Sequence, residues 1–82
     1  MPRYFFDVFD GHRTTRDELG LDVADLSQVR HEAIDALPDV AREQLPDGDD
    51  TAFFVLVRDE SGQQIFKATL ALKSEWLLKK TN

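Results

Sequence analysis

The chain has 82 residues, of which 16 are acidic and 10 basic, so its formal net charge is −6, and it contains no cysteine. This length fits a single domain, and the lack of cysteine excludes disulfides, thiolate metal sites and cysteine nucleophiles. No apolar run reaches the length of about 18 residues that a membrane span needs, and the first residues lack a signal-peptide pattern. We therefore expect a cytoplasmic protein without a membrane partner.

The first strand is predicted at residues 4–9, Tyr-Phe-Phe-Asp-Val-Phe, which are rich in aromatic and β-branched types. Asp10-Gly11 follows at once and favours a tight type I′ hairpin turn, which requires positive φ at both positions. Residues 12–16 then predict a short polar strand at a sheet edge. Residues 21–24 are expected to lead away from this hairpin in extended form.

A helix is predicted from Asp25, because Asp25 and Gln28 have the spacing of a capping box. Apolar residues then recur at helical spacing and predict one inward-facing stripe. Pro38 lies inside this stripe, and since proline lacks an amide hydrogen, we expect a kink or break near residues 36–37. The stripe consists of Leu26, Val29, Ala33, Leu37, Val40, Ala41 and either Gln44 or Leu45.

A second hairpin is predicted at residues 51–72, with a four-residue turn at 59–62. Such a turn pairs Val55 with Phe66 and Leu56 with Ile65. The sequence Arg-Asp-Glu-x-Gly occurs at 16–20 and again at 58–62, which we attribute to shared turn chemistry rather than to duplication. The tail at residues 73–82 is amphipathic enough over 73–80 for a short helix.

The predicted fold is α+β, with the order strand, strand, helix, strand, strand in one domain spanning residues 1–82. One principal helix covers one face of a four-stranded, mainly antiparallel sheet whose strand order stays open. The predicted core consists of Tyr4, Phe6, Val8, Leu26, Val29, Ala33, Leu37, Phe53, Val55, Val57, Phe66, Ala68 and Leu70.

The opening Pro2-Arg3-Tyr4-Phe5-Phe6, followed by Asp10-Gly11, resembles a family of short bacterial proteins. The resemblance extends over about residues 2–72 through the Asp17-Glu18-x-Gly20 turn, Asp25-Leu26 with the helix start from Arg30 to Ala33, and the residues from Val57 to Gly62. The family carries a domain of unknown function, so the resemblance implies no activity, ligand or catalytic residue.

Three patterns resemble chemical sites and have simpler explanations. His31 and Asp35 have the helical spacing of two metal ligands, but a catalytic zinc site needs three. Asp47, Asp49 and Asp50 lack the spaced ligands and distal Glu of an EF-hand. The neighbouring acids at 17–18 and 59–60 fit solvated turns better than an acid–base pair. We therefore expect no catalytic, cofactor-binding or metal-binding residue.

The charge distribution argues against nucleic-acid binding. Residues 1–60 contain 15 acidic and 6 basic side chains, a balance of −9, whereas residues 61–82 contain 1 acidic and 4 basic, a balance of +3. A protein that binds the phosphate backbone needs a basic face. The same acidity favours a basic protein as partner.

The second face of the sheet is expected to be apolar and to need a cover, since one helix shields one face. The residues of this possible interface are Phe5, Phe9, Phe54, Leu56 and Ile65, together with Trp76 from the tail. Either the tail folds back over the face, or two copies stack in a homodimer. We therefore expect a non-enzymatic interaction or regulatory module that acts as a homodimer. The alternatives are an acidic adaptor or inhibitor of a basic protein and a small-molecule or metal-binding module.

Overall fold

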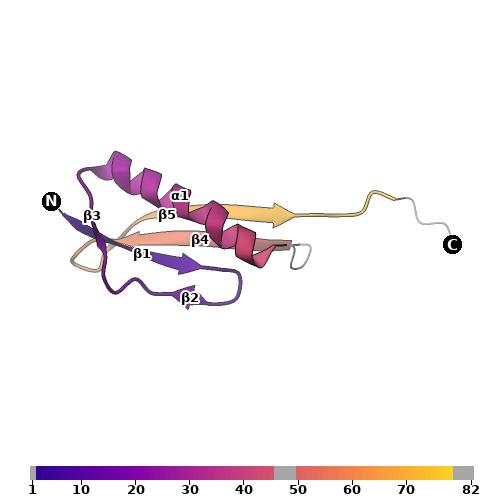
Figure 1. Ribbon diagram of the computed structural model, residues 1–82, viewed down its shortest axis with the longest axis horizontal. Coiled ribbons are helices and arrows are strands. Elements are labelled where there is room, and N and C mark those ends of the chain that lie inside the picture. The colour runs from indigo at the N-terminus through magenta and orange to yellow at the C-terminus, as the bar shows by residue number, and fades with distance from the viewer. Residues whose placement is uncertain (1, 46–49, 79–82) are drawn as a thin grey trace.

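The computed structural model of the chain describes residues 2–45 and 50–78. Its elements are β1 (Arg3–Phe9), β2 (Thr14–Thr15), β3 (Leu21–Asp22), α1 (Leu26–Gln44), β4 (Asp50–Arg58) and β5 (Gln64–Lys73). The strands pair antiparallel in the order β2-β1-β4-β5, and β3 pairs with the first residues of β1. The helix α1 lies across one face of this sheet (Figure 1). The α+β prediction is thus confirmed, with β3 as an additional strand.

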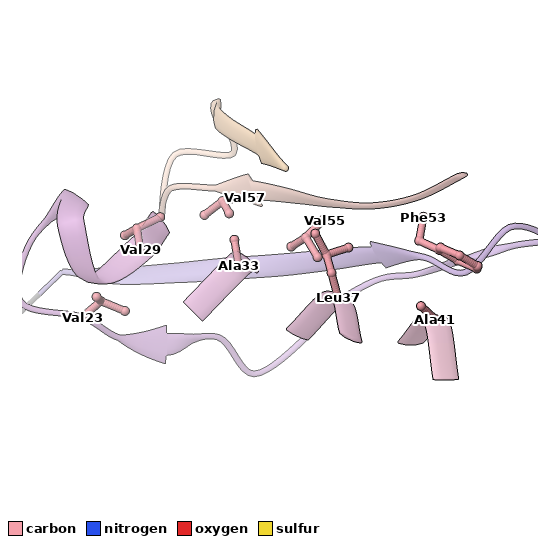
Figure 2. Packing of buried hydrophobic residues seen from close by; sticks show 8 residues of the cluster. All are labelled: Val23, Val29, Ala33, Leu37, Ala41, Phe53, Val55 and Val57. Carbon is pink, nitrogen blue, oxygen red and sulfur yellow. The ribbon is translucent and has the colours of Figure 1, made fainter. Parts of the chain in front are cut away.

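The core lies between α1 and the central strand β4. Phe53, Val55 and Val57 alternate along β4 and are at most 1% exposed. Figure 2 shows them opposite the buried stripe of α1, which consists of Val29, Ala33, Leu37 and Ala41. The core thus forms where alternate apolar residues of β4 pack against the apolar stripe of α1, as the two sequence patterns predicted.

The predicted core is confirmed in its centre and wrong at two positions. Leu26 and Leu70 are 66% and 40% exposed, because they lie in the first turn of α1 and on the outermost strand. Val23 (2% exposed) is a core residue that was not predicted, and its amide donates to the Pro2 carbonyl at 3.0 Å. Tyr4, Phe6, Val8, Phe66 and Ala68 are partly buried against the core.

The β4–β5 hairpin pairs two residues away from the predicted register. Val55 lies opposite Ala68, where the sequence predicted Phe66. Gln63 joins the turn through its carbonyl, which accepts from the Asp59 amide at 2.9 Å, and a bulge beside Arg58 adds one more residue. Because side chains alternate with a period of two, a two-residue shift leaves each of them on its predicted face.

The first hairpin has a wider turn than predicted. Phe9 lies opposite Thr14, so residues 10–13 form the loop, and the second strand is limited to Thr14–Thr15. Gly11 has a φ of +96°, whereas Asp10 is not in the positive-φ region, so a type I′ turn is wrong. The Asp10 carboxylate instead accepts from the amides of His12 and Arg13, both at 2.9 Å, which stabilises the wider loop.

The helix begins at the predicted position and continues through Pro38. Asp25 is the N-cap, and its carboxylate accepts from the Gln28 amide at 2.9 Å. The Gln28 side chain donates to Glu32 instead of reaching back, so half of the capping box forms. The helix is unbroken from Leu26 to Gln44, so of the two outcomes expected near residues 36–37, a kink or a break, the break is wrong. Burial of Leu37 and Ala41 on either side of Pro38 offsets the lost hydrogen bond.

We expect Pro38→Ala to stabilise the protein, because alanine restores an amide donor inside α1 and removes the steric conflict of the ring. Pro38 is exposed, so little packing is lost. The expected gain is about 1–2 kcal/mol, or several degrees in the melting temperature. Thermal unfolding followed by circular dichroism measures it. A lower melting temperature in the variant would contradict this reading of the helix.

The tail does not form the predicted helix in its described part. Lys73 belongs to β5, and residues 74–78 have neither helical nor strand structure. Figure 1 shows this segment running away from the sheet beyond the end of β5. Trp76, Leu77 and Leu78 are 86%, 86% and 76% exposed, so the tail does not cover the second face of its own sheet.

Candidate functional site

The sheet face opposite α1, called the helix-free face below, carries most of the predicted interface residues. They come from alternate positions of two neighbouring strands and are half-buried: Phe5, Phe9, Phe54 and Leu56. Ile65 lies in the bulge of β5 and is 36% exposed, whereas Trp76 lies apart in the tail. The structure therefore brings four of the six predicted residues together on one face.

On the helix-free face, two aromatic rings stack on each other and two cationic side chains lie over aromatic rings. The rings of Phe9 and Phe54 stack with centroids 4.8 Å apart and an interplanar angle of 22°. The Lys67 Nζ lies 4.3 Å from the centroid of Phe54, and the Arg58 guanidinium lies 5.0 Å from that of Phe5. The face is therefore less apolar than its alternation pattern predicted, because two long cationic side chains lie over it.

A buried ion pair joins β1 to β4 at the centre of this face. The Arg58 Nε donates to Asp7 Oδ2 at 2.7 Å, and its Nη2 donates to Asp7 Oδ1 at 3.1 Å. Each of the two side chains is 11% exposed. The hydrogen bond from Arg58 holds the pKa of Asp7 below its usual value, although burial opposes this shift. Asp7 is therefore charged in the folded protein and stabilises the pairing of β1 with β4. The sequence analysis did not predict Arg58 as its partner.

The loop at residues 16–20 closes the same network. The Asp17 amide donates to Asp7 Oδ1 at 2.9 Å, and the Asp17 carbonyl accepts from Arg58 Nη2 at 3.0 Å. The Asp17 carboxylate accepts from the amides of Phe6, Leu19 and Gly20 at 3.0–3.1 Å. Burial acts to raise the pKa of Asp17, but these amide bonds outweigh it and lower the pKa. Asp17 thus fastens the loop to β1.

Gly20 allows this loop to approach β1 closely. Its φ is +73°, and a Cβ there would lie 2.8 Å from Arg3 Cγ and from Phe5 Cε2. Gly62 in the second copy of the motif also has positive φ, but nothing lies within 4 Å of the place its Cβ would occupy. The Asp59 carboxylate accepts from the amides of Ser61 and Gln63, as Asp17 does in its own turn. The prediction of shared turn chemistry is confirmed. The first copy of the motif, at residues 16–20, also contacts β1.

The predicted metal-like patterns do not gather ligands in the described part of the chain. His31 and Asp35 line a small surface hollow of about 120 Å³ on α1, beside Arg30 and Ile34. Within residues 2–45 and 50–78, no three His, Asp or Glu side chains are grouped so that they would hold a metal ion. Asp47 and Asp49 lie outside the described residues, and Asp50 begins β4.

A second surface, which the sequence analysis did not predict, lies between α1 and the outer strand β5. We call it the α1–β5 groove, and it encloses about 400 Å³. Its lining is mainly apolar and includes Ile34, Leu37, Pro38, Phe66, Ala68 and Leu70. Among the described strands β5 pairs with β4 alone, so its outer edge borders this groove. Leu70, which was predicted to be in the core, instead lines the groove.

The described helix of the chain is not long and apolar enough to cross a membrane. No curated protein and no solved structure matches the sequence. The sequence profile of a domain of unknown function, DUF6894, matches residues 3–71, which include all five strands except the last residues of β5. The chain therefore belongs to the DUF6894 family.

Proposed function

We propose that the protein is a non-enzymatic interaction module that acts in the cytoplasm as a homodimer. The observation that carries the proposal is the outer edge of β5, which pairs with no other described strand, together with three large, exposed apolar side chains in the segment that follows β5: Trp76, Leu77 and Leu78. Soluble monomers rarely expose contiguous apolar patches of this kind, and an open strand edge is a ready template for pairing with another chain.

The ionisable groups support a structural rather than a catalytic role. A general acid that works near neutral pH needs a carboxyl group with a raised pKa. Asp7, Asp10, Asp17 and Asp59 have lowered pKa values instead, because each accepts hydrogen bonds from neighbouring donors. These donors are Arg58 for Asp7, the loop amides of Arg13 and His12 for Asp10, the amide of Phe6 in β1 and the amides of Gly20 and Leu19 for Asp17, and Ser61 for Asp59.

The helix-free face supports a dimer less directly than the β5 edge does. Two stacked faces would enclose the exposed Lys67 ammonium group above Phe54 and the buried pair of Asp7 and Arg58. Removing an ammonium group from water costs several kcal/mol unless a partner compensates. Pairing along the β5 edge leaves the helix-free face open, so Lys67 lies beside the added strand rather than enclosed between two stacked sheets.

The mass of the full chain in solution tests the proposal. We expect a mass twice the 9.4 kDa of one chain at high concentration, with dissociation on dilution over an approximately hundredfold range. Sedimentation equilibrium gives this mass. A monomer throughout the range would overturn the proposal.

The variant Phe54→Asp identifies the surface used. If the dimer forms along the β5 edge, the variant keeps the mass of a dimer, because Phe54 lies on the helix-free face. A folded monomer would instead assign the contact to stacked helix-free faces.

A further inference from the structure

We propose that the tail of one copy pairs as an added strand with β5 of a second copy and places Trp76 and Leu78 in the partner's α1–β5 groove. This inference rests on the proposed homodimer and names its interface. The contact is reciprocal, so each copy both donates a tail and accepts one, as two-fold symmetry requires.

The first argument is the alternation of side chains along β5. Phe66 and Ala68 pack against the core under α1, and Leu70 lines the groove beside them. Once the tail is extended as an added strand, it keeps this alternation, so Trp76 and Leu78 would fall on the same side as Phe66. Leu77 would fall on the other side. The two tail residues with even numbers therefore belong to the side on which the groove lies.

The second argument is the register that a two-fold axis permits. In an antiparallel pair, residues directly opposite each other project to the same face. If Leu72 lies opposite its own copy, Trp76 lies opposite the partner's Ala68 and Leu78 opposite the partner's Phe66. Both partner positions border the groove in this structure. The described tail, residues 74–78, is thus long enough to reach along the groove.

The third argument is that the groove and the tail match in chemistry. The groove is mainly apolar and encloses about 400 Å³, and the tail presents an indole that is 86% exposed in its own chain. Tryptophan combines a large apolar area with one N–H donor, which makes it a frequent anchor at interfaces. The charged side chains that line the groove, Arg30 and Lys67, are both cationic, so the match rests on the apolar lining and not on net charge.

The tail lies beyond the segment that the family profile matches, residues 3–71. In the proposed dimer the matched segment supplies the acceptor surface, α1 and most of β5, and residues 74–78 supply the inserted strand. The outer edge of β5 would then be covered by the partner, as open edges in stable proteins usually are.

The single tryptophan of the chain reports on the contact without any substitution. On dilution through the dimer–monomer transition, we expect the emission of Trp76 to shift to longer wavelength as the indole returns to water. Accessibility to iodide quenching should rise over the same concentrations. A dimer in which the emission and the quenching do not change would overturn the inference and leave the proposed homodimer intact, whereas a monomer at all concentrations would overturn both.

Two neighbouring substitutions test the predicted side of the strand. Trp76→Asp should weaken the dimer at least about tenfold, because it would place a carboxylate in the groove. Leu77→Asp should change the dissociation constant less than about threefold, because residue 77 lies on the other side, towards the partner's Lys67. Both wild-type side chains are exposed in the monomer, so each variant should keep the circular dichroism of the native fold. Equal effects of the two substitutions would contradict the register.

An engineered disulfide tests the two-fold axis directly, since the wild-type chain has no cysteine that could form a competing bond. Leu72→Cys should form a covalent dimer on mild oxidation, because residue 72 would lie opposite its own copy at a distance that a disulfide spans. Ala71→Cys is the matched control, and it should cross-link much more slowly because residue 71 would lie opposite the partner's Lys73. Faster cross-linking at position 71 would refute the proposed pairing.

Discussion

Replacing Phe53 by alanine is expected to unfold much of the protein near body temperature. Phe53 is 1% exposed and lies in the core with Ala41 and Val55. Removing a buried phenyl group costs about 3–5 kcal/mol, whereas a chain of this length has only about 4–12 kcal/mol of stability in total. The melting temperature should fall by at least about 12 °C, since each kcal/mol corresponds to about 4–8 °C in small domains.

Phe54→Ala is the matched control, because the neighbouring residue faces the opposite side of the same strand. Phe54 is half-buried and contacts Phe9 and Lys67, so we expect a loss of about 1–2 kcal/mol. Urea unfolding of the two variants measures the difference. If Phe54→Ala were the more damaging change, the assignment of faces to β4 would be reversed.

Asp7→Asn is expected to destabilise the protein by about 3 kcal/mol, because it breaks a buried ion pair. The substitution keeps the shape of the side chain but would direct an amide N–H₂ group at the N–H groups of Arg58. The Asp17 amide also loses a charged acceptor. Denaturant unfolding at neutral pH gives the change in the free energy of unfolding.

Asp39→Asn provides the control for the charge itself. Asp39 accepts from Arg42 at 3.0 Å, but the two side chains are 79% and 75% exposed. An exposed pair of this kind contributes at most about 0.5 kcal/mol. Similar losses in Asp7→Asn and Asp39→Asn would mean that the central ion pair does not stabilise the sheet.

The pH dependence of stability should also change in Asp7→Asn. The pKa of Asp7 is lowered in the folded protein by its hydrogen bond with Arg58. A lowered pKa gives stability that is present above the unfolded value of about 4 and is lost as the pH falls through the folded value. The difference in stability between wild type and Asp7→Asn should therefore narrow below about pH 4, and a constant difference would argue against a charged Asp7.

The sequence was sufficient for the main strands β1, β4 and β5, for the helix α1 and for their faces, because these depend on local periodicity, but not for β3 or for the tail. The apolar alternation of residues 53–57 and the stripe from Val29 to Ala41 each determine an inward side without reference to the other. The β4–β5 register was wrong by two residues for the same reason: alternation is unchanged by such a shift, and the shift depends on a bulge and on one hydrogen bond in the turn.

The candidate surfaces could be predicted only in part. Phe5, Phe9, Phe54 and Leu56 were placed on one face by alternation, but the pattern does not show where Arg58 and Lys67 lie over the rings. Asp7 offered a signal that was not used, since a carboxylate between aromatic residues of a strand requires a partner if it is buried. The α1–β5 groove depends on which strand is outermost, and strand order is not encoded in local periodicity.

The ion pair at the centre of the helix-free face has a consequence for how the sheet assembles. Asp7 and Arg58 are 51 positions apart in the sequence, whereas β4 and β5 are joined by a short turn. Local contacts form at lower entropic cost than distant ones, so we expect the β4–β5 hairpin to form first and β1 to dock onto its free edge later. If β1 docked two residues out of register, its correct face would still be buried. Apolar contacts alone would therefore disfavour the misaligned state only weakly. It would, however, separate Asp7 from Arg58 and leave a carboxylate buried without a partner, so the charge makes the docking of β1 selective for one alignment.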